Sequence, residues 1–198
     1  MAFLRFSQWA VGTCLATLAL CSATGSALAQ EPARVKFSTS AGAFVVEVYP
    51  DKAPKTVENF LHYVKDKHYD GTIFHRVIDN FMVQGGGFDA QYNQKPTRPP
   101  IPLEANNGLK NDVGTIAMAR TSDPNSATSQ FFINVKNNAM LNAPSPDGFG
   151  YTVFGKVVSG SEVIQKIKSS PTGAGGPFQT DVPKTSILIN SVTLEKKP

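Results

Sequence analysis

Residues 73–88, IFHRVIDNFMVQGGGF, constrain the fold more than any other stretch of the chain. They contain a β-prone run over 73–78, a polar turn at 79–80, a second β-prone run over 81–84, and three glycines at 85–87. Two such runs joined by a short polar turn predict an antiparallel hairpin. Because alternate residues of a strand share a face, the same pattern predicts which side chains can gather.

The hairpin also carries side chains suited to binding. Phe81, Met82 and Gln84 cannot all share one face by alternation alone. We therefore expect a bend, at the three glycines or at the start of the second run, to bring them together. The gathered set would consist of the Arg76 guanidinium, the amide of Gln84 and large apolar side chains. Such a set suits a neutral ligand with one polar group, such as a peptide bond.

The rest of the chain predicts short strands and two amphipathic helices. Further β-prone runs predict strands over 34–39, 43–48, 114–119, 130–135, 151–158 and 187–194. Apolar residues at i, i+3, i+4 and i+7 from Val57 predict a helix that begins near Pro54, and a short second helix follows Gly160. Residues 89–111 and 171–183 have the composition of loops. Many short strands with two such helices predict a closed β-barrel that has a helix for each mouth.

Three separate motifs resemble one known family. FHRVI (74–78), FMVQGG (81–86) and SQFFI (129–133) occur in the order found in cyclophilins, the peptidyl-prolyl cis-trans isomerases. The resemblance extends from about Val35 to Leu194, and the segment MARTSDPNSATSQFFINV is most similar to periplasmic cyclophilins of Gram-negative bacteria. It implies a mainly β fold in one domain over residues 30–198, a closed eight-stranded antiparallel barrel capped by two α-helices.

The resemblance implies an enzyme that accelerates rotation about X–Pro bonds. This rotation costs about 18–20 kcal/mol because it breaks amide resonance, and unaided it takes roughly tens to hundreds of seconds. An ordinary turnover of about 10 per second requires a barrier at least about 3–4 kcal/mol lower. One directed hydrogen bond in a water-poor pocket that prefers the twisted amide has an effect on this scale. We therefore expect no metal and no cofactor.

The resemblance assigns Arg76 as the catalytic residue. As the amide twists, the prolyl nitrogen regains its lone pair, and a fixed guanidinium N–H stabilises that change in charge. An apolar seat for the proline ring is implied at Phe81, Met82, Phe132 and Leu141. Further substrate-binding residues are implied at Gln84, Met118, Ala119, Arg120, Gln130, Met140 and Tyr151.

The residue types alone leave structural alternatives at these positions. An arginine in a strand commonly forms a surface salt bridge, and Phe and Met side chains usually pack in the core. The Gln84 amide is equally suited to binding loop backbone. Met140 and Tyr151 also stand where many eukaryotic cyclophilins carry a tryptophan and a histidine. Because the indole N–H donor is absent, we do not expect tight cyclosporin binding, whereas isomerase chemistry needs neither residue.

The first 29 residues have the pattern of a cleaved secretory signal peptide. Arg5 provides a positive start, residues 9–21 form an apolar run, and residues 27–29 form an A-x-A cleavage site. The apolar run is short for a membrane span, and a retained anchor helix is the alternative. Both cysteines lie in this segment, so the mature chain has none for a disulfide. We expect a periplasmic protein that has no membrane attachment after cleavage.

Charge and motifs argue against several other functions. The net charge is only +4 and Lys and Arg form no dense run, so nucleic-acid binding has little support. The three histidines lack the H-E-x-x-H spacing of a zinc site, and there is no G-x-S-x-G motif of a hydrolase. The glycines at 85–87 are not followed by the Lys-Ser/Thr of a phosphate loop. The expected partners are proline-containing peptides and unfolded exported proteins, bound by a monomer.

A binding module is the main alternative to an enzyme. A periplasmic holding chaperone would use the same groove without turnover, and a structural envelope protein would have no effect on rotation. Arg76→Ala separates the enzyme from the holding chaperone, since isomerase activity requires the guanidinium and suppression of aggregation does not.

Overall fold

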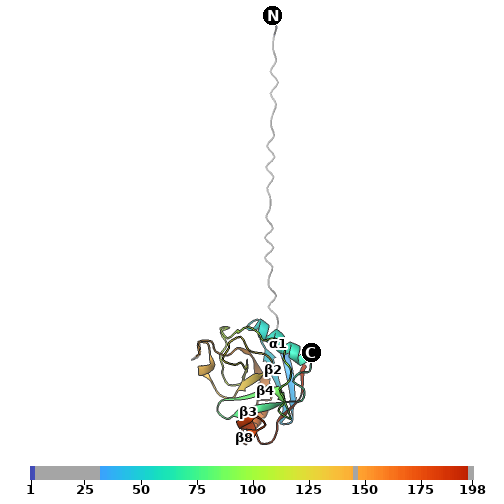
Figure 1. Ribbon diagram of the computed structural model, residues 1–198. Helices are drawn as coiled ribbons and strands as arrows, with labels where there is room; N and C mark the ends of the chain where they lie inside the picture. The colour runs from blue at the N-terminus through green and yellow to red at the C-terminus, as the bar shows by residue number, and fades with distance from the viewer. Residues whose placement is uncertain (3–31, 145–146, 196–198) are drawn as a thin grey trace.

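The computed structural model describes residues 1–2, 32–144 and 147–195, so the predicted signal peptide lies outside the described residues. Eight strands form a closed barrel in the order β1-β10-β3-β4-β6-β5-β7-β2 (Figure 1). Every neighbouring pair in the barrel is antiparallel. The predicted eight-stranded antiparallel barrel with two helices is therefore confirmed.

The predicted strands and helices are all present. The barrel strands are β1 (Ala33–Thr39), β2 (Gly42–Val48), β3 (Thr72–Ile78), β4 (Met82–Asp89), β5 (Thr115–Met118), β6 (Phe131–Asn134), β7 (Val153–Ser159) and β10 (Leu188–Leu194). The helices are α1 (Pro54–Lys65), α2 (Ser161–Lys168) and a short 3-10 helix, η1 (Ala139–Leu141). Their ends agree with the sequence patterns to within a few residues, except that β4 continues through the glycines to Asp89.

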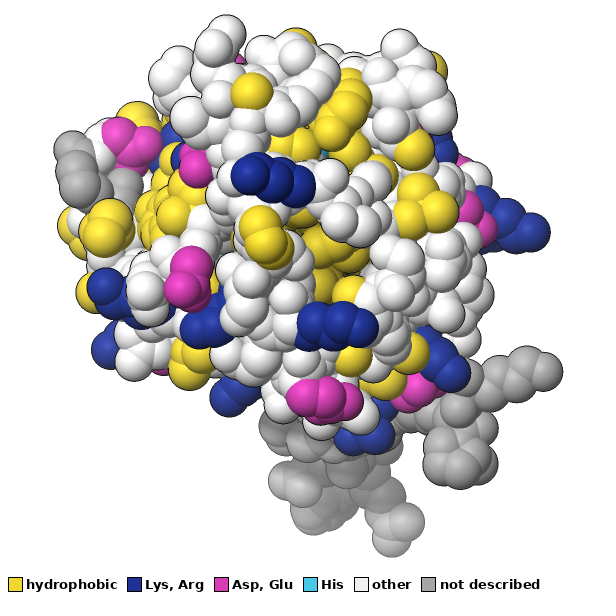
Figure 2. All heavy atoms as spheres, turned by 90° about the horizontal axis from the view of Figure 1, so that it is seen from below, with side chains coloured by type: hydrophobic (Ala, Val, Ile, Leu, Met, Phe, Trp, Pro, Cys, Tyr) yellow, Lys and Arg dark blue, Asp and Glu magenta, His cyan; other side chains and the backbone are white. Residues whose placement is uncertain are grey.

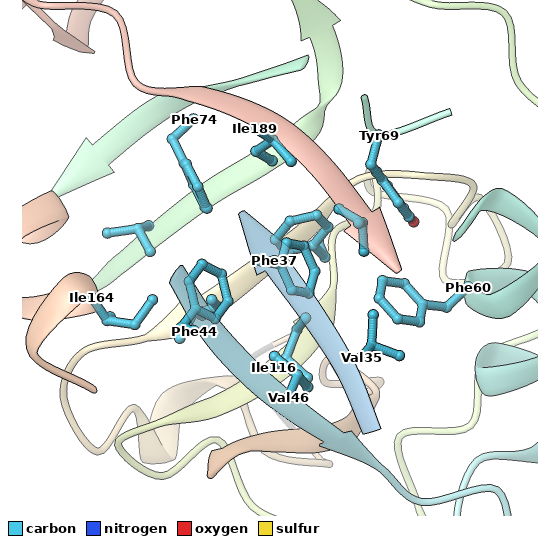
Figure 3. Packing of buried hydrophobic residues seen from close by; sticks show 14 of the residues in the cluster. Val35, Phe37, Phe44, Val46, Phe60, Tyr69, Phe74, Ile116, Ile164 and Ile189 are labelled. Atoms are coloured by element: carbon cyan, nitrogen blue, oxygen red, sulfur yellow. The ribbon is translucent and has the colours of Figure 1, made fainter. Parts of the chain in front are cut away.

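The apolar faces of α1 and α2 complete the core of the barrel. The buried apolar side chains of the two helices belong to the same cluster as the barrel interior: Val57, Phe60, Val64, Val163, Ile164 and Ile167. Figure 3 shows Phe60 of α1 and Ile164 of α2 approaching the core from opposite sides. Burial of these faces, rather than helix propensity, is the main source of stability for such short helices.

Aromatic side chains fill the barrel interior. The rings of Phe37 and Phe44 are stacked with their centroids 4.7 Å apart (Figure 3). Phe131 meets Phe37 edge-on at 5.5 Å, and all three residues are at most 1% exposed. Because a core packed in this way has no room for a ligand, a ligand must bind outside the barrel.

The loop prediction for residues 171–183 is wrong. This segment forms β8 (Thr172–Gly175) and β9 (Phe178–Pro183), which pair as a two-stranded sheet. Gly176, at φ +53°, forms the turn, and a Cβ there would lie 2.4 Å from the Tyr92 ring. The glycines that suggested a loop thus allow a tight hairpin against another side chain.

The face drawn in Figure 2 carries both positive and negative side chains. On the face shown in Figure 2, Lys and Arg side chains stand singly, with Asp and Glu between them. That face therefore has no continuous basic stripe of the kind that binds nucleic acid. Within the described parts of the chain, no helix has the length and apolar character needed to cross a bilayer.

A bulge in β3 interrupts the alternation of its side chains. Phe74 lies opposite Gly85, whereas Arg76 lies opposite Gln84, so β3 has one residue more than β4 between these pairs. Phe74 and Val77, three positions apart, consequently both belong to the interior cluster. Arg76 is the exposed residue of the strand. The bulge thus lets Arg76 face outward while the apolar residues on both sides of it face the core.

His75, the other residue of the bulge, is buried beneath the β8–β9 hairpin. It is only 3% exposed, and its ring centroid lies 4.8 Å from that of Phe88 and 5.5 Å from that of Phe178. Burial lowers the pKa of His75 from 6.5 to about 4, and the charge of Arg76 acts in the same direction. The aromatic cluster therefore holds His75 in its neutral form.

We predict that His75 makes the folded protein sensitive to acid. The unfolded chain binds the proton near pH 6.5 and the folded protein near pH 4, so the stabilisation is complete above pH 6.5 and is lost as the pH falls towards 4. The loss amounts to about 3 kcal/mol of unfolding free energy. Urea unfolding of wild type and His75→Phe across this pH range measures the difference, because the carboxylates titrate alike in both proteins. An identical pH dependence in the two would contradict the prediction.

Candidate active site

One row of paired residues crosses the outside of the barrel. In order across β3, β4, β6, β5 and β7, the register pairs Arg76, Gln84, Phe132, Ala117 and Val153. Directly opposite residues of antiparallel strands share a face, so these side chains all point away from the interior. The row therefore has a guanidinium and an amide at one end and an apolar floor at the other.

A cavity of about 180 Å³ lies over the part of this row that contains Arg76, Gln84 and Phe132. It is lined by Arg76, Phe81, Met82, Gln84, Ala119, Arg120, Phe132, Leu141 and Tyr151. Every residue of this lining is among the site residues expected from the sequence. Sites for drug-sized ligands are about 300–1,000 Å³, so this cavity suits a single ring or side chain.

An apolar seat forms the floor and walls of the cavity. Met82 and Phe132 are 2% and 4% exposed and belong to an apolar cluster separate from the barrel interior. Phe81, Leu141 and Tyr151 are partly buried against the same cluster. Phe81 joins Met82 because it lies in the turn before β4, where its N–H donates to the carbonyl of Ile78 at 3.2 Å. Of the two expected positions for a bend, the start of the strand is therefore the one that brings these side chains together.

Arg76 lies at the edge of the cavity with its donors available. Its side chain forms no ion pair with any carboxylate in residues 32–144 and 147–195. The surface salt bridge that the residue type alone suggests is therefore not seen in the described parts of the chain. A guanidinium next to a small cavity with an apolar floor can donate a hydrogen bond to a bound amide.

Gln84 is oriented by a second glutamine. Its Nε2 donates to Oε1 of Gln130 at 2.9 Å, which leaves the Gln84 carbonyl oxygen free to accept a hydrogen bond. Gln130 does not line the small cavity; it lies in a neighbouring polar hollow of about 330 Å³. Its side chain occupies space that Gly87 leaves, since a Cβ on Gly87 would lie 2.5 Å from Cγ of Gln130.

Besides Gln130, two more of the expected site residues lie outside the small cavity. Met118 is 2% exposed and belongs to the interior cluster, because the outward residue of β5 is its neighbour Ala117. The assignment of Met118 to the substrate site is wrong for this reason. Met140 is 59% exposed on η1 and does not line the cavity, whereas the next residue, Leu141, does.

Three buried asparagines hold the walls of the cavity, and sequence reasoning missed them. Asn138 donates through Nδ2 to the carbonyl of Phe81 and to Oδ1 of Asn134, both at 2.7 Å. Asn111 donates through Nδ2 to the carbonyl of Leu141 at 3.1 Å. All three asparagines are at most 1% exposed. Because Asn is also common in solvated loops, composition gave no signal that these amides are buried.

A larger hollow of about 700 Å³ lies between α1 and the end of β10. Its apolar lining includes Val57 and Leu61 of the helix and Val192 and Leu194 of the strand. None of the residues that the sequence motifs single out lies in it. The small cavity, where the Arg76 guanidinium meets an apolar seat, is therefore the candidate active site.

Comparisons with known proteins agree with this geometry. Residues 34–194 match the family model described as cyclophilin type peptidyl-prolyl cis-trans isomerase/CLD. A peptidyl-prolyl cis-trans isomerase of Streptomyces antibioticus is 56% identical over 162 residues, which cover 81% of this chain and 97% of the relative. Peptidyl-prolyl cis-trans isomerase B of Escherichia coli is 54% identical over 164 residues, which cover 82% and 99% of the two chains.

Solved structures give the same result. A cyclophilin type isomerase of Cryptosporidium parvum superposes with a TM-score of 0.69 at 27% identity, covering 85% of this chain and all of the other. A second structure of that protein, determined in the presence of the dipeptide Ala-Pro, has a TM-score of 0.67. The sequence match over nearly the whole barrel and the shared fold lead to one conclusion: this chain belongs to the cyclophilin-type peptidyl-prolyl cis-trans isomerase family.

Proposed function

We propose that this isomerase accelerates X–Pro rotation in unfolded exported proteins in the periplasm, as a monomer without cofactor or metal. The observation that carries the mechanism is the position of Arg76, which lies opposite Gln84 and lines the cavity with the apolar seat, without a carboxylate partner in the described residues. The periplasmic role rests on the signal-peptide pattern of the first 29 residues. The Ala-Pro dipeptide in the related structure supports a proline-containing substrate.

The cavity is proposed to hold the proline ring. The ring fits against Phe132 and Met82, which are already buried and therefore lose little side-chain entropy on binding. The carbonyl oxygen of Gln84 accepts a hydrogen bond from the substrate backbone next to the ring. These contacts fix the ring while the residue before it remains free to turn.

Arg76 is proposed to stabilise the twisted amide. The planar amide has little electron density on nitrogen, but the twisted amide has a lone pair there, so a guanidinium N–H near the ring nitrogen binds the twisted form more tightly. Such differential binding lowers the barrier, whereas equal binding of both forms would not. No covalent bond is made or broken in this scheme.

We predict that Arg76→Ala lowers kcat/KM for a proline-containing peptide by about 100-fold or more, which is the usual effect of losing one donor to a transition state. The fold should be kept, because Arg76 is exposed and makes no ion pair in the described residues. Exchange NMR on a short Ala-Pro peptide measures the rate. Arg34→Ala is the matched control, since Arg34 is 58% exposed and pairs with Glu47 on the neighbouring strand.

The same pair of proteins separates an isomerase from a holding chaperone. An unchanged rate in a folded Arg76→Ala protein would contradict the catalytic assignment. A wild-type protein that suppresses aggregation but does not accelerate rotation would replace the isomerase with a binding module.

The proposed export can be tested by following cleavage of the signal peptide. We predict that the full-length chain, expressed in a Gram-negative host, is recovered in the periplasmic fraction and begins at Gln30, because the A-x-A site ends at Ala29. Cell fractionation with N-terminal sequencing measures both. Full-length chain in the membrane fraction would support the retained anchor, and full-length chain in the cytoplasm would contradict export.

A further inference from the structure

Arg120 is a buried arginine to which the mechanism above gives no role. Its side chain is 2% exposed, and it follows the end of β5 at the edge of the cavity. A buried guanidinium is costly unless its donors are bound, so its partners show which part of the structure it stabilises.

The Arg120 guanidinium binds the segment 147–151. Its Nε and Nη2 both donate to the carbonyl of Gly150, at 3.0 and 2.9 Å, and Nη2 also donates to the carboxylate of Asp147. Its Nη1 donates to the carbonyl of Thr121, the next residue in its own loop, at 2.9 Å. One side chain thus joins the end of β5 to a segment about thirty residues later in the sequence.

The same guanidinium lies over the ring of Tyr151, with Cζ 4.4 Å from the ring centroid. This distance is within the range of a cation–π contact, which reaches about 2 kcal/mol when the cation is desolvated. The Tyr151 ring meets Phe132 edge-on at 5.7 Å. The Tyr151 N–H donates to the carbonyl of Leu141 at 2.9 Å. Tyr151 therefore links the Arg120 guanidinium to both the floor and the far wall of the cavity.

We propose that Arg120 is a positioning residue that sets the width of the proline cavity by holding Tyr151, and through it Leu141, against Phe132. The inference rests on the proposed use of this cavity as the seat of the proline ring. Without the guanidinium, Gly150 and Tyr151 lose their contacts with Arg120, while the N–H of Met118 in β5 still donates to the carbonyl of Thr152. The wall around Tyr151 can then move away from the floor. Arg76 belongs to β3, a different element from Arg120 and the segment that it binds, so the effect falls on binding of the ring and not on stabilisation of the twisted amide.

The test compares wild type with Arg120→Gln, Tyr151→Leu and the double variant. Each single substitution should raise KM for a short Ala-Pro peptide about tenfold, equivalent to about 1.4 kcal/mol, and should change kcat by less than about threefold. The double variant should have about the same KM as Tyr151→Leu, because residues that act through one wall are not additive. Arg98→Ala is the matched control, since Arg98 is 46% exposed and pairs with Asp66 at 3.3 Å.

A second variant covers the case in which Arg120→Gln does not fold. Arg120→Lys keeps the positive charge but has a single nitrogen, so it cannot bind Gly150 and Asp147 as the guanidinium does, and its KM should lie between those of wild type and Tyr151→Leu. An unchanged KM in a folded Arg120 variant would overturn the inference, as would a lower kcat at constant KM or additive effects in the double variant. A wild-type protein without isomerase activity would instead contradict the proposed function.

Discussion

The bulge in β3 determines where the guanidinium of Arg76 lies. Without the extra residue, strict alternation would place Arg76 on the same face as Phe74, which is the barrel interior. A charge there would be buried among aromatic rings without a partner. The bulge keeps Phe74 and Val77 in the core and moves Arg76 to the outside, opposite Gln84. Core packing and the cation of the candidate active site thus depend on the same local irregularity.

The packed interior explains why the site is a shallow cavity on the wall of the barrel. Residues of β3, β4 and β6 line its strand side, and their relative positions are fixed by the backbone register. The walls come from loop residues outside the strands, so strand pairing does not fix their positions. Buried polar side chains hold them instead: the asparagines bind the carbonyls of Phe81 and Leu141, and Arg120 binds that of Gly150. A rigid floor with tethered walls suits a ligand as small as one ring.

Local patterns were sufficient for the barrel and for the residues that line the candidate cavity. Alternation and the helical stripe identified every strand of the barrel and both helices, and the motifs identified the residues that line the cavity. The predictions failed where tertiary packing determines the direction of a side chain or the conformation of a segment. Met118 and Ala117 look equally suited to a short strand, and only pairing with β6 and β7 shows which one faces outward. Glycine and asparagine are both common in loops, so the sequence alone predicts a loop at β8–β9 and gives no sign that Asn111 is buried. The structure shows Tyr92 packed against Gly176, and the carbonyl of Leu141 bound by Asn111.

The most direct test of this account is a crystal structure of the mature protein with a bound Ala-Pro peptide. The account predicts that the proline ring lies on Phe132 and Met82, with an N–H of Arg76 within about 3 Å of the prolyl amide. A guanidinium that points away from a ring bound there would contradict the mechanism. A peptide bound between α1 and β10 instead would show that the site itself has been assigned to the wrong cavity.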